Sequence, residues 1–222
     1  RGQIALSGRD RASYLHGLLT NDIQGLQPGT GTYAAWLTAQ GRMTTDMHVL
    51  ESGDMTLVDV PAAQVQDIVQ RLDQFIFTED VQVAYLSVQL AAVGVHGPQA
   101  AASIERVLAG AADLSDWPEY RNARLAFGDA PVVVARIDQL GVPGFTLYVS
   151  PTSEESLRSA LERAGARRVA ADAVTVARIE AGYPVFIIRL PYRFAPFEAH
   201  KKTAIARVRN IIAADPEVTR WV

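Results

Sequence analysis

Two strand-like segments joined by a turn are the clearest feature in the pattern of apolar and polar positions. Both arms, 31–38 and 42–50, are rich in aromatic, β-branched and apolar residues, and Gly41 lies where the chain must reverse. Successive side chains on a strand point to opposite faces, so the second arm divides into two sets. One face should carry Met43, Thr45, Met47 and Val49, and the other Arg42, Thr44, Asp46, His48 and Leu50. An aspartate and a histidine two residues apart are common on solvated strands, so this pair alone does not indicate a site.

The rest of the chain alternates between strand-like and helix-like segments. Strand patterns occupy 3–6, 55–60, 81–86, 88–95, 132–137 and 145–149, and the segment 88–95 is apolar enough to be covered on both faces. Helices are expected to begin at Ser7, Pro61, Gly97, Ser153 and Asp172, with a polar link over 113–122. This alternation, with its hairpins, predicts an α+β fold of mixed or antiparallel sheets with flanking helices.

The helix that Asp172 is expected to cap places a carboxylate beside small apolar residues. Ala173, Val176, Ala177 and Glu180 share one face by their spacing, and that face is the one expected to be packed. Burying an unpaired carboxylate is costly, so Glu180 there would need a partner. The Glu180 carboxylate could accept hydrogen bonds from donors on a bound ligand. The alternative, which the pattern alone favours, is a helix-end glutamate that reaches water or pairs with Arg178 or Arg189.

Composition narrows the class of protein. The chain has 222 residues, 49% hydrophobic and 20% charged, with a net charge of −3, which is an ordinary soluble balance with no nucleic-acid or membrane-surface footprint. No apolar run approaches the roughly 20 residues that span a bilayer. The absence of cysteine excludes disulfides, thiolate catalysis and cysteine-ligated metal sites within these residues. No signal-peptide pattern is visible, so a cytoplasmic location is expected. The start at Arg1 suggests a fragment or the ordered part of a longer protein.

An ordered series of motifs resembles the folate-binding T-protein (GcvT) superfamily. The series includes Leu19-Thr-Asn-Asp-Ile23, Tyr33-Ala-Ala-Trp-Leu-Thr38, Gly41-Arg42 with Asp46, and Arg178-Ile-Glu-Ala-Gly182. Further matches lie at 7–16, 28–29, 71–81, 93–98 and 143–145. Single short motifs such as Thr-Asn-Asp are weak signals, whereas the order of the whole series of motifs over residues 3 to 182 is specific. The superfamily contains the aminomethyltransferase of the glycine cleavage system and the YgfZ-type proteins linked to iron–sulfur cluster maintenance.

The resemblance implies a tetrahydrofolate site in the N-terminal region. At the position of Asp46 the aminomethyltransferases carry an aspartate near the reactive folate nitrogens, which assists methylene transfer, so Asp46 is the candidate catalytic residue. The glutamate matching Glu180 holds the pteridine ring, as a carboxylate that accepts two hydrogen bonds can. Tyr33 and Trp36 are candidates to line the pocket, with ordinary packing as the alternative for both and the favoured one for Trp36. Asn21 is a further candidate, although local backbone capping is its simplest role.

The histidines are expected to have ordinary roles. His48 is interpreted as a satisfied surface or core residue rather than a catalyst. His16 and His96 share that interpretation, and neither has metal-ligand spacing to another histidine.

Within the superfamily, two features resemble the YgfZ type. They are Gly41-Arg42 in place of a double glycine, and Pro143-Gly-Phe145 in place of the transferase pattern Gly-Tyr-Thr-Gly-Glu. The YgfZ type implies an accessory role in iron–sulfur cluster assembly or repair, with iron–sulfur proteins or a carrier protein as partners. Its signature Lys-Gly-Cys-(Tyr/Phe)-x-Gly-Gln-Glu is absent, which a loop missing between Phe186 and Ile187 would explain. The alternatives are an aminomethyltransferase and a non-catalytic protein-interaction module.

The expected organisation has two folate-binding lobes followed by a helical segment. The first lobe spans 1–90, the second 91–186, and the C-terminal segment 187–222, where the β-barrel of the family is not visible. A helix opening near Pro196 should place Ile205, Val208, Ile211 and Ile212 inside, and Lys201, Lys202, Arg207 and Arg209 mostly outside. The basic side could attract a folate polyglutamate tail or an acidic partner, but a solvated helix face is the favoured interpretation.

Overall fold

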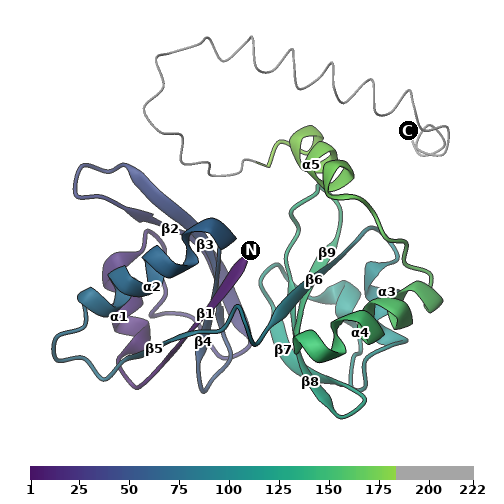
Figure 1. Ribbon diagram of the computed structural model, residues 1–222, viewed down its shortest axis with the longest axis horizontal. Coiled ribbons are helices and arrows are strands. Elements are labelled where there is room, and N and C mark those ends of the chain that lie inside the picture. Colours follow the sequence, from purple (N-terminus) through teal and green to yellow (C-terminus); the bar gives the residue numbers. More distant parts are fainter. Residues whose placement is uncertain (184–222) are drawn as a thin grey trace, which may run out of the picture. The chain divides into compact units, whose positions relative to one another are not determined.

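Two antiparallel sheets with helices packed against them make up the computed structural model, which describes residues 1–183 (Figure 1). The first sheet has five strands in the order β2-β3-β4-β1-β5, and the second has four in the order β6-β9-β8-β7. Each paired strand in these residues runs antiparallel to its neighbour. The predicted α+β class, with antiparallel sheets and flanking helices, is confirmed.

The first sheet is built around the predicted hairpin. Its strands are β1 (Gly2–Ser7), β2 (Thr30–Leu37), β3 (Met43–Glu51), β4 (Thr56–Val60) and β5 (Gln82–Tyr85). Between β2 and β3 the chain reverses through Gly41, whose φ of +76° is a conformation that glycine adopts without strain. The register pairs Tyr33 with His48 and Ala35 with Asp46, and it shifts at a bulge after Trp36.

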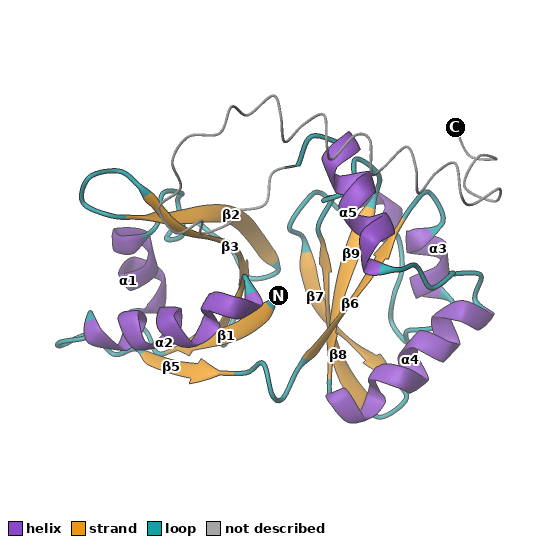
Figure 2. Ribbon diagram, turned by 45° about the horizontal axis from the view of Figure 1, so that its top comes forward, coloured by secondary structure: helices purple, strands orange, loops and turns teal. Residues whose placement is uncertain are grey.

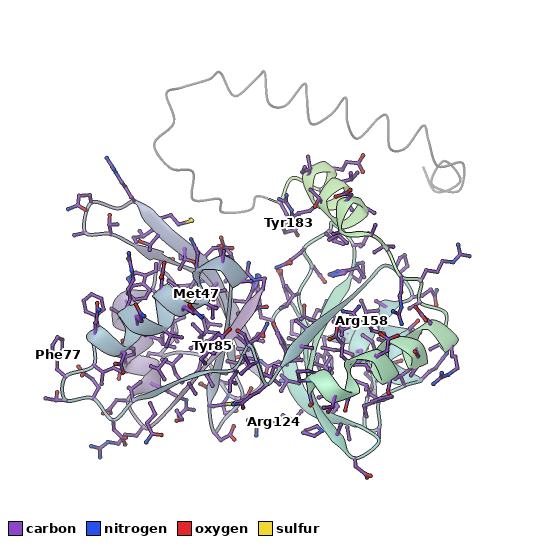
Figure 3. All side chains as sticks on the ribbon, viewed as in Figure 1. Met47, Phe77, Tyr85, Arg124, Arg158 and Tyr183 are labelled. Atoms are coloured by element: carbon purple, nitrogen blue, oxygen red, sulfur yellow. The ribbon has the colours of Figure 1, made fainter. Side chains whose placement is uncertain are left out.

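One face of this sheet is covered by helices α1 (Arg11–Leu18) and α2 (Val65–Gln74), the latter preceded by the short 3-10 helix η1 (Ala62–Gln64). The alternation in β3 buries Met47 and Val49 in this core, as the sequence predicts (Figure 3). From α2, Ile68 and Leu72 pack against them. The other face of β3, which carries Asp46 and His48, is therefore directed away from this core.

The second sheet has its own helical cover. Its strands are β6 (Ala91–His96), β7 (Asn122–Phe127), β8 (Ala130–Arg136) and β9 (Gly144–Val149). Helices α3 (Ala100–Glu105) and α4 (Pro151–Arg163) supply Ile104, Leu157 and Leu161 to the core, and the 3-10 helix η2 (Leu114–Asp116) supplies Leu114 (Figure 2). The remaining helix, α5 (Ala171–Glu180), follows α4 in the chain.

A third apolar cluster contains residues of both sheets. Leu50 and Leu57 of the first sheet pack with Ala135, Ile137 and Tyr148, which belong to or follow strands of the second. Leu50 lies on the same face of β3 as Asp46 and His48. The polar positions of this face therefore lie next to a contact between the sheets, which gives the site residues from both.

Two element predictions are corrected by the structure, and one strand, β7, was not predicted. The first helix begins at Arg11 rather than at Ser7, which belongs to β1, and the Asp10 carboxylate accepts a hydrogen bond from the Asp80 backbone N–H (2.8 Å) instead of capping the helix. The strand expected over 88–95 begins at Ala91, and because Val93 and Val95 are buried while Gly94 is exposed, it is not covered on both faces. Strand β7 begins at Asn122, where the predicted polar link ends.

The C-terminal segment 187–222, including the helix expected near Pro196 and the junction of Phe186 with Ile187, lies outside the described residues. Within residues 1–183, no helix combines the length and the apolar character that crossing a membrane requires.

Candidate functional site

Four polar side chains meet on the face of the first sheet that its helices leave uncovered. Asp46 and His48 lie two residues apart on β3 and share this face, as predicted. The register sets Tyr33 of β2 on one side of His48 and Asp59 of β4 on the other. Asp46, His48 and Asp59 are all buried, while Tyr33 is 39% exposed. The arrangement is a buried group of ionisable residues with the partly exposed ring of Tyr33 at its rim.

Arg1 joins the two carboxylates of this group. Its Nη1 lies 3.5 Å from Asp46 Oδ2, and its Nε donates to Asp59 Oδ1 at 3.1 Å. Its Nη2 also donates to the Asp59 backbone oxygen at 2.7 Å. One guanidinium therefore partly neutralises both carboxylates. This lowers the free-energy cost of burying them in a medium of low dielectric.

Asp59 is held from the second sheet as well. The hydroxyl of Tyr148, on β9, donates to Asp59 Oδ2 at 2.7 Å, and both side chains are buried. Burial raises the pKa of the Asp59 carboxyl, and the opposing effects of Arg1 and Tyr148 lower it. Since its two oxygens each have a donor, Asp59 is a satisfied structural carboxylate.

Asp46 differs from Asp59 because one of its oxygens is unused. Oδ1 is buried and has no hydrogen-bond partner among the described residues. Burial raises the pKa of the Tyr33 phenol, and the nearby Asp46 carboxylate raises it further. A buried carboxylate oxygen without a donor is rare in folded proteins and indicates a place where an N–H or O–H group of a ligand can bind.

His48 lies between two aromatic rings. Its ring stacks on Tyr120 with centroids 5.7 Å apart and is tilted against Tyr33 at 5.8 Å. Its Nε2 is 2.5 Å from the side-chain amide of Gln139, whereas its buried Nδ1 has no partner among the described residues. Burial, with the Arg1 charge in addition, lowers the pKa of His48 to about 3, so the ring is neutral near pH 7.

Two other predicted residues lie apart from this group or are already occupied. Trp36 projects from β2 to the face opposite Tyr33, where it belongs to the helix-covered core and contacts Phe75 at 6.0 Å. This position fits ordinary packing, the interpretation favoured for Trp36 from the sequence. Asn21 donates to Thr32 Oγ1 (2.7 Å) and to the Tyr33 backbone oxygen (3.0 Å), and its own oxygen accepts from the Asp22 N–H. Asn21 thus secures the turn and the strand that carries Tyr33.

Glu180 is exposed, as in the alternative that the sequence pattern favoured, whereas the packed face expected for its helix is not found. It is the last residue of α5, and none of the residues of that helix is buried. Asp172 lies in the first turn, and Ala170 rather than Asp172 occupies the capping position. Tyr183 follows α5 three residues after Glu180 (Figure 3).

Five contributors to the group were not identified from the sequence: Arg1, Asp59, Tyr120, Gln139 and Tyr148. Asp59 left a signal, because a charged residue at an inner position of an apolar strand needs a partner. The other four reach the group only through the pairing of distant strands and loops. Of the remaining histidines, His16 is partly exposed, and no cluster of three or more potential metal ligands occurs within residues 1–183.

The chemistry of the group suits a heteroaromatic ligand with N–H donors. Asp46 offers an acceptor oxygen, His48 a ring nitrogen, and Tyr33 and Tyr120 offer aromatic surface. Arg1 supplies a positive charge that offsets the negative charges of Asp46 and Asp59. The residues present do not form a nucleophile–base pair of the hydrolase type.

Comparison with known proteins places this chain in a family. The aminomethyltransferase of Rubrobacter xylanophilus is 29% identical over 198 residues, which cover 89% of this chain and 53% of that protein. The aminomethyltransferase of Thermus thermophilus is 27% identical over 190 residues, 83% of this chain and 53% of that protein. The chain thus spans about half the length of the curated relatives it matches.

A solved structure and a family model agree with these relatives. The glycine cleavage system aminomethyltransferase T of Bartonella henselae has the same fold, with a TM-score of 0.71 and 21% identity over 82% of this chain and 48% of that one. The family model described as the GCVT N-terminal domain matches residues 1–208. This chain therefore belongs to the GCVT N-terminal domain family.

Proposed function

We propose that this chain binds tetrahydrofolate through the face that carries Asp46, as the folate-binding part of a folate-dependent protein of its family. The observation that carries the proposal is the buried Asp46 Oδ1, which lacks a donor among the described residues. The curated relatives are aminomethyltransferases, and the resemblance assigns their folate-facing aspartate to the position of Asp46. Tetrahydrofolate supplies ring N–H donors for such an oxygen, so the site and the ligand are complementary.

Each side chain of the site has a role that follows from its position. Asp46 accepts a hydrogen bond from a ligand N–H and can hold a proton at Oδ1 when the basicity of that nitrogen changes. Arg1 lies 3.5 Å from the other Asp46 oxygen and places a positive charge beside it. Tyr33 offers its partly exposed ring to the heterocycle at the rim. Tetrahydrofolate itself would supply the nitrogen atoms that carry a one-carbon unit.

Glu180 is proposed as the second folate contact, on the strength of the resemblance. Its exposure at the end of α5 leaves both carboxylate oxygens available to a ligand. A carboxylate in that state can accept two hydrogen bonds from an amino-pyrimidine edge.

Two finer functions are compatible with folate binding. An accessory role of the YgfZ kind, in iron–sulfur cluster assembly or repair, is favoured by Gly41-Arg42 in the hairpin turn and by Pro143-Gly-Phe145 at the start of β9. Aminomethyl transfer in glycine cleavage is the alternative, favoured by the names of the relatives. Turnover with an aminomethyl-lipoyl carrier protein separates them, because only the transferase requires it.

Calorimetric titration with tetrahydrofolate under reducing conditions tests the proposal. Asp46→Ala removes the unused oxygen while leaving Arg1 paired with Asp59, so the fold should persist. We expect Asp46→Ala and Glu180→Ala each to weaken binding about tenfold or more, as loss of a charge-assisted hydrogen bond does. Asp67→Ala, on the exposed side of α2, is the matched control and should bind as the wild type does. Unchanged affinity in both site variants would contradict the assigned site, and a wild type that does not bind would favour the interaction module.

A further inference from the structure

Two buried polar atoms on the same strand face lack partners within the described residues. They are Asp46 Oδ1 and His48 Nδ1. Their residues are separated by one strand repeat, about 6.6 Å between Cα atoms at 3.3 Å per residue. The residues that carry them are 6% and 3% exposed, so these atoms are hidden from solvent in the absence of a ligand. Two such atoms on residues two positions apart on one strand face suit one ligand edge better than two independent defects of packing.

The surroundings of His48 determine what each atom offers. The Gln139 amide nitrogen, 2.5 Å from His48 Nε2, can only donate, so Nε2 accepts and the proton of the neutral ring resides on Nδ1. Nδ1–H is therefore a hydrogen-bond donor, and the Asp46 carboxylate oxygen is an acceptor. The pair presents a donor and an acceptor next to each other on one face.

We propose that His48 is a ligand-contacting residue that, with Asp46, selects the reduced form of the pterin ring. This inference rests on the proposed function and deepens it. The carbonyl of a tetrahydropterin has a ring N–H on each side, and the one on the pyrimidine side belongs to the amino-pyrimidine edge proposed for Glu180. The other N–H, which exists only in the reduced ring, donates to Asp46 Oδ1 while the carbonyl accepts from His48 Nδ1–H. In a fully oxidised pterin the same ring nitrogen carries a lone pair, which an ionised carboxylate repels. The edge then cannot dock, and His48 loses its contact as well.

Access to the two atoms runs past the more exposed members of the group. Tyr33 contacts the His48 ring and is 39% exposed, and the Arg1 side chain beside Asp46 is 26% exposed. A ligand that enters past these two side chains approaches the face on the side opposite Tyr120 and Gln139, which lie before β7 and after β8 and contact His48. The heterocycle can then stack on the partly exposed Tyr33 ring.

The test compares two ligands and three variants of the full chain. His48→Leu removes the donor, His48→Asn retains an N–H close to the ring position, and Val49→Ala destabilises the opposite face of the same strand. We expect His48→Leu to lower the affinity for tetrahydrofolate about tenfold, the effect of one lost hydrogen bond, and to leave the weaker binding of folic acid within about twofold. His48→Asn should recover most of the loss. Val49→Ala should bind both ligands as the folded wild type does.

A second measurement uses the wild type alone. In a long-range proton–nitrogen correlation spectrum of the labelled protein, the Nδ1 resonance of His48 should shift on saturation with tetrahydrofolate and stay in place with folic acid. A histidine that only supports packing would show no such difference. Unchanged tetrahydrofolate affinity in His48→Leu, or an unmoved Nδ1 resonance at saturation, would overturn the role of His48 while folate binding stands. A wild type that binds no tetrahydrofolate would overturn both.

Discussion

At the scale of single residues, the environment of His48 favours the neutral imidazole. The ring is buried between Tyr33 and Tyr120, and Arg1 adds a positive charge nearby. Together these lower its pKa to about 3, while an unfolded chain returns it to about 6.5. The folded state therefore binds fewer protons than the unfolded state between these two values. A buried neutral histidine of this kind can form hydrogen bonds at neutral pH. In acid it lowers the stability of the fold, because its protonation favours the unfolded chain.

This difference predicts an acid-dependent loss of stability. Since the folded pKa is depressed, the free energy of unfolding falls as the pH drops below about 6.5 and continues to fall toward pH 3. At pH 5 the histidine alone should cost about 2 kcal/mol relative to pH 7.5. Urea unfolding of the wild type and His48→Leu at both pH values measures it. The difference in free energy between the two proteins should change by about 2 kcal/mol, and parallel pH profiles would contradict the assignment.

The strand period alone locates part of this site. It puts Asp46 and His48 on one face, and the same rule, applied to β2, separates Trp36 from Tyr33 because they are three residues apart. The resemblance suggested both aromatic residues, and only Tyr33 lies with Asp46. Asp59 and Tyr148 could not be placed beforehand, because 89 residues separate them and only the contact between the sheets joins them.

At the scale of elements, the junction of β1 with α1 shows how backbone contacts set a helix boundary. Gly8 has a φ of +100°, and a Cβ built on it would lie 2.0 Å from the Asp80 backbone oxygen. The chain here is held against the segment before β5, since the Asp10 N–H donates to the Asp80 oxygen at 3.2 Å. These contacts keep residues 8–10 out of the helix, so the Ser7 start predicted from the capping pattern is wrong.

Paired glycine substitutions test this account. Gly8→Ala forces both a clash and an unfavourable φ, and it should lower the free energy of unfolding by about 2–3 kcal/mol. Gly17→Ala lies within α1, where no heavy atom is within 4 Å of the new Cβ, and it should be neutral or stabilising by up to about 1 kcal/mol. Urea unfolding curves of both variants provide the measurement. Equal effects of the two would show that the Gly8 contact does not constrain the junction.

Elements with a strong hydrophobic period were predictable, and those without one were not. The hairpin, β4, α2 and α4 follow from alternation or helical spacing of apolar residues. Strand β7 has the sequence Asn-Ala-Arg-Leu-Ala-Phe, which contains no β-branched residue, and its pairing with β8 supplies the order that its own sequence does not. In α5 the small residues suggested a packed face, yet none of them is buried. Small side chains indicate burial weakly, because they add little apolar surface.

At the scale of the described molecule, the two sheets are joined by a mixed contact. Its apolar part is the cluster around Leu50 and Tyr148, and its buried polar part includes the hydrogen bond from the Tyr148 hydroxyl to Asp59. Arg1, which precedes β1 of the first sheet, donates a hydrogen bond to the other oxygen of the Asp59 carboxylate. The site therefore depends on this contact, because His48 and Asp46 belong to one sheet while the second sheet supplies the donor that satisfies their neighbour Asp59.

Tyr148→Phe should show how much this hydrogen bond contributes. The ring remains, so the apolar packing is retained, but Asp59 Oδ2 loses its 2.7 Å donor in a buried position. A buried acceptor left without a partner costs about 1–3 kcal/mol, and the free energy of unfolding should fall by that amount. Tyr85→Phe makes the same chemical change on β5 at a partly buried hydroxyl and should cost less than about 0.5 kcal/mol. Urea unfolding of both variants measures the loss in free energy of unfolding that each substitution causes. Equal losses would mean that apolar packing, rather than the bond to Asp59, holds the sheets together at this point.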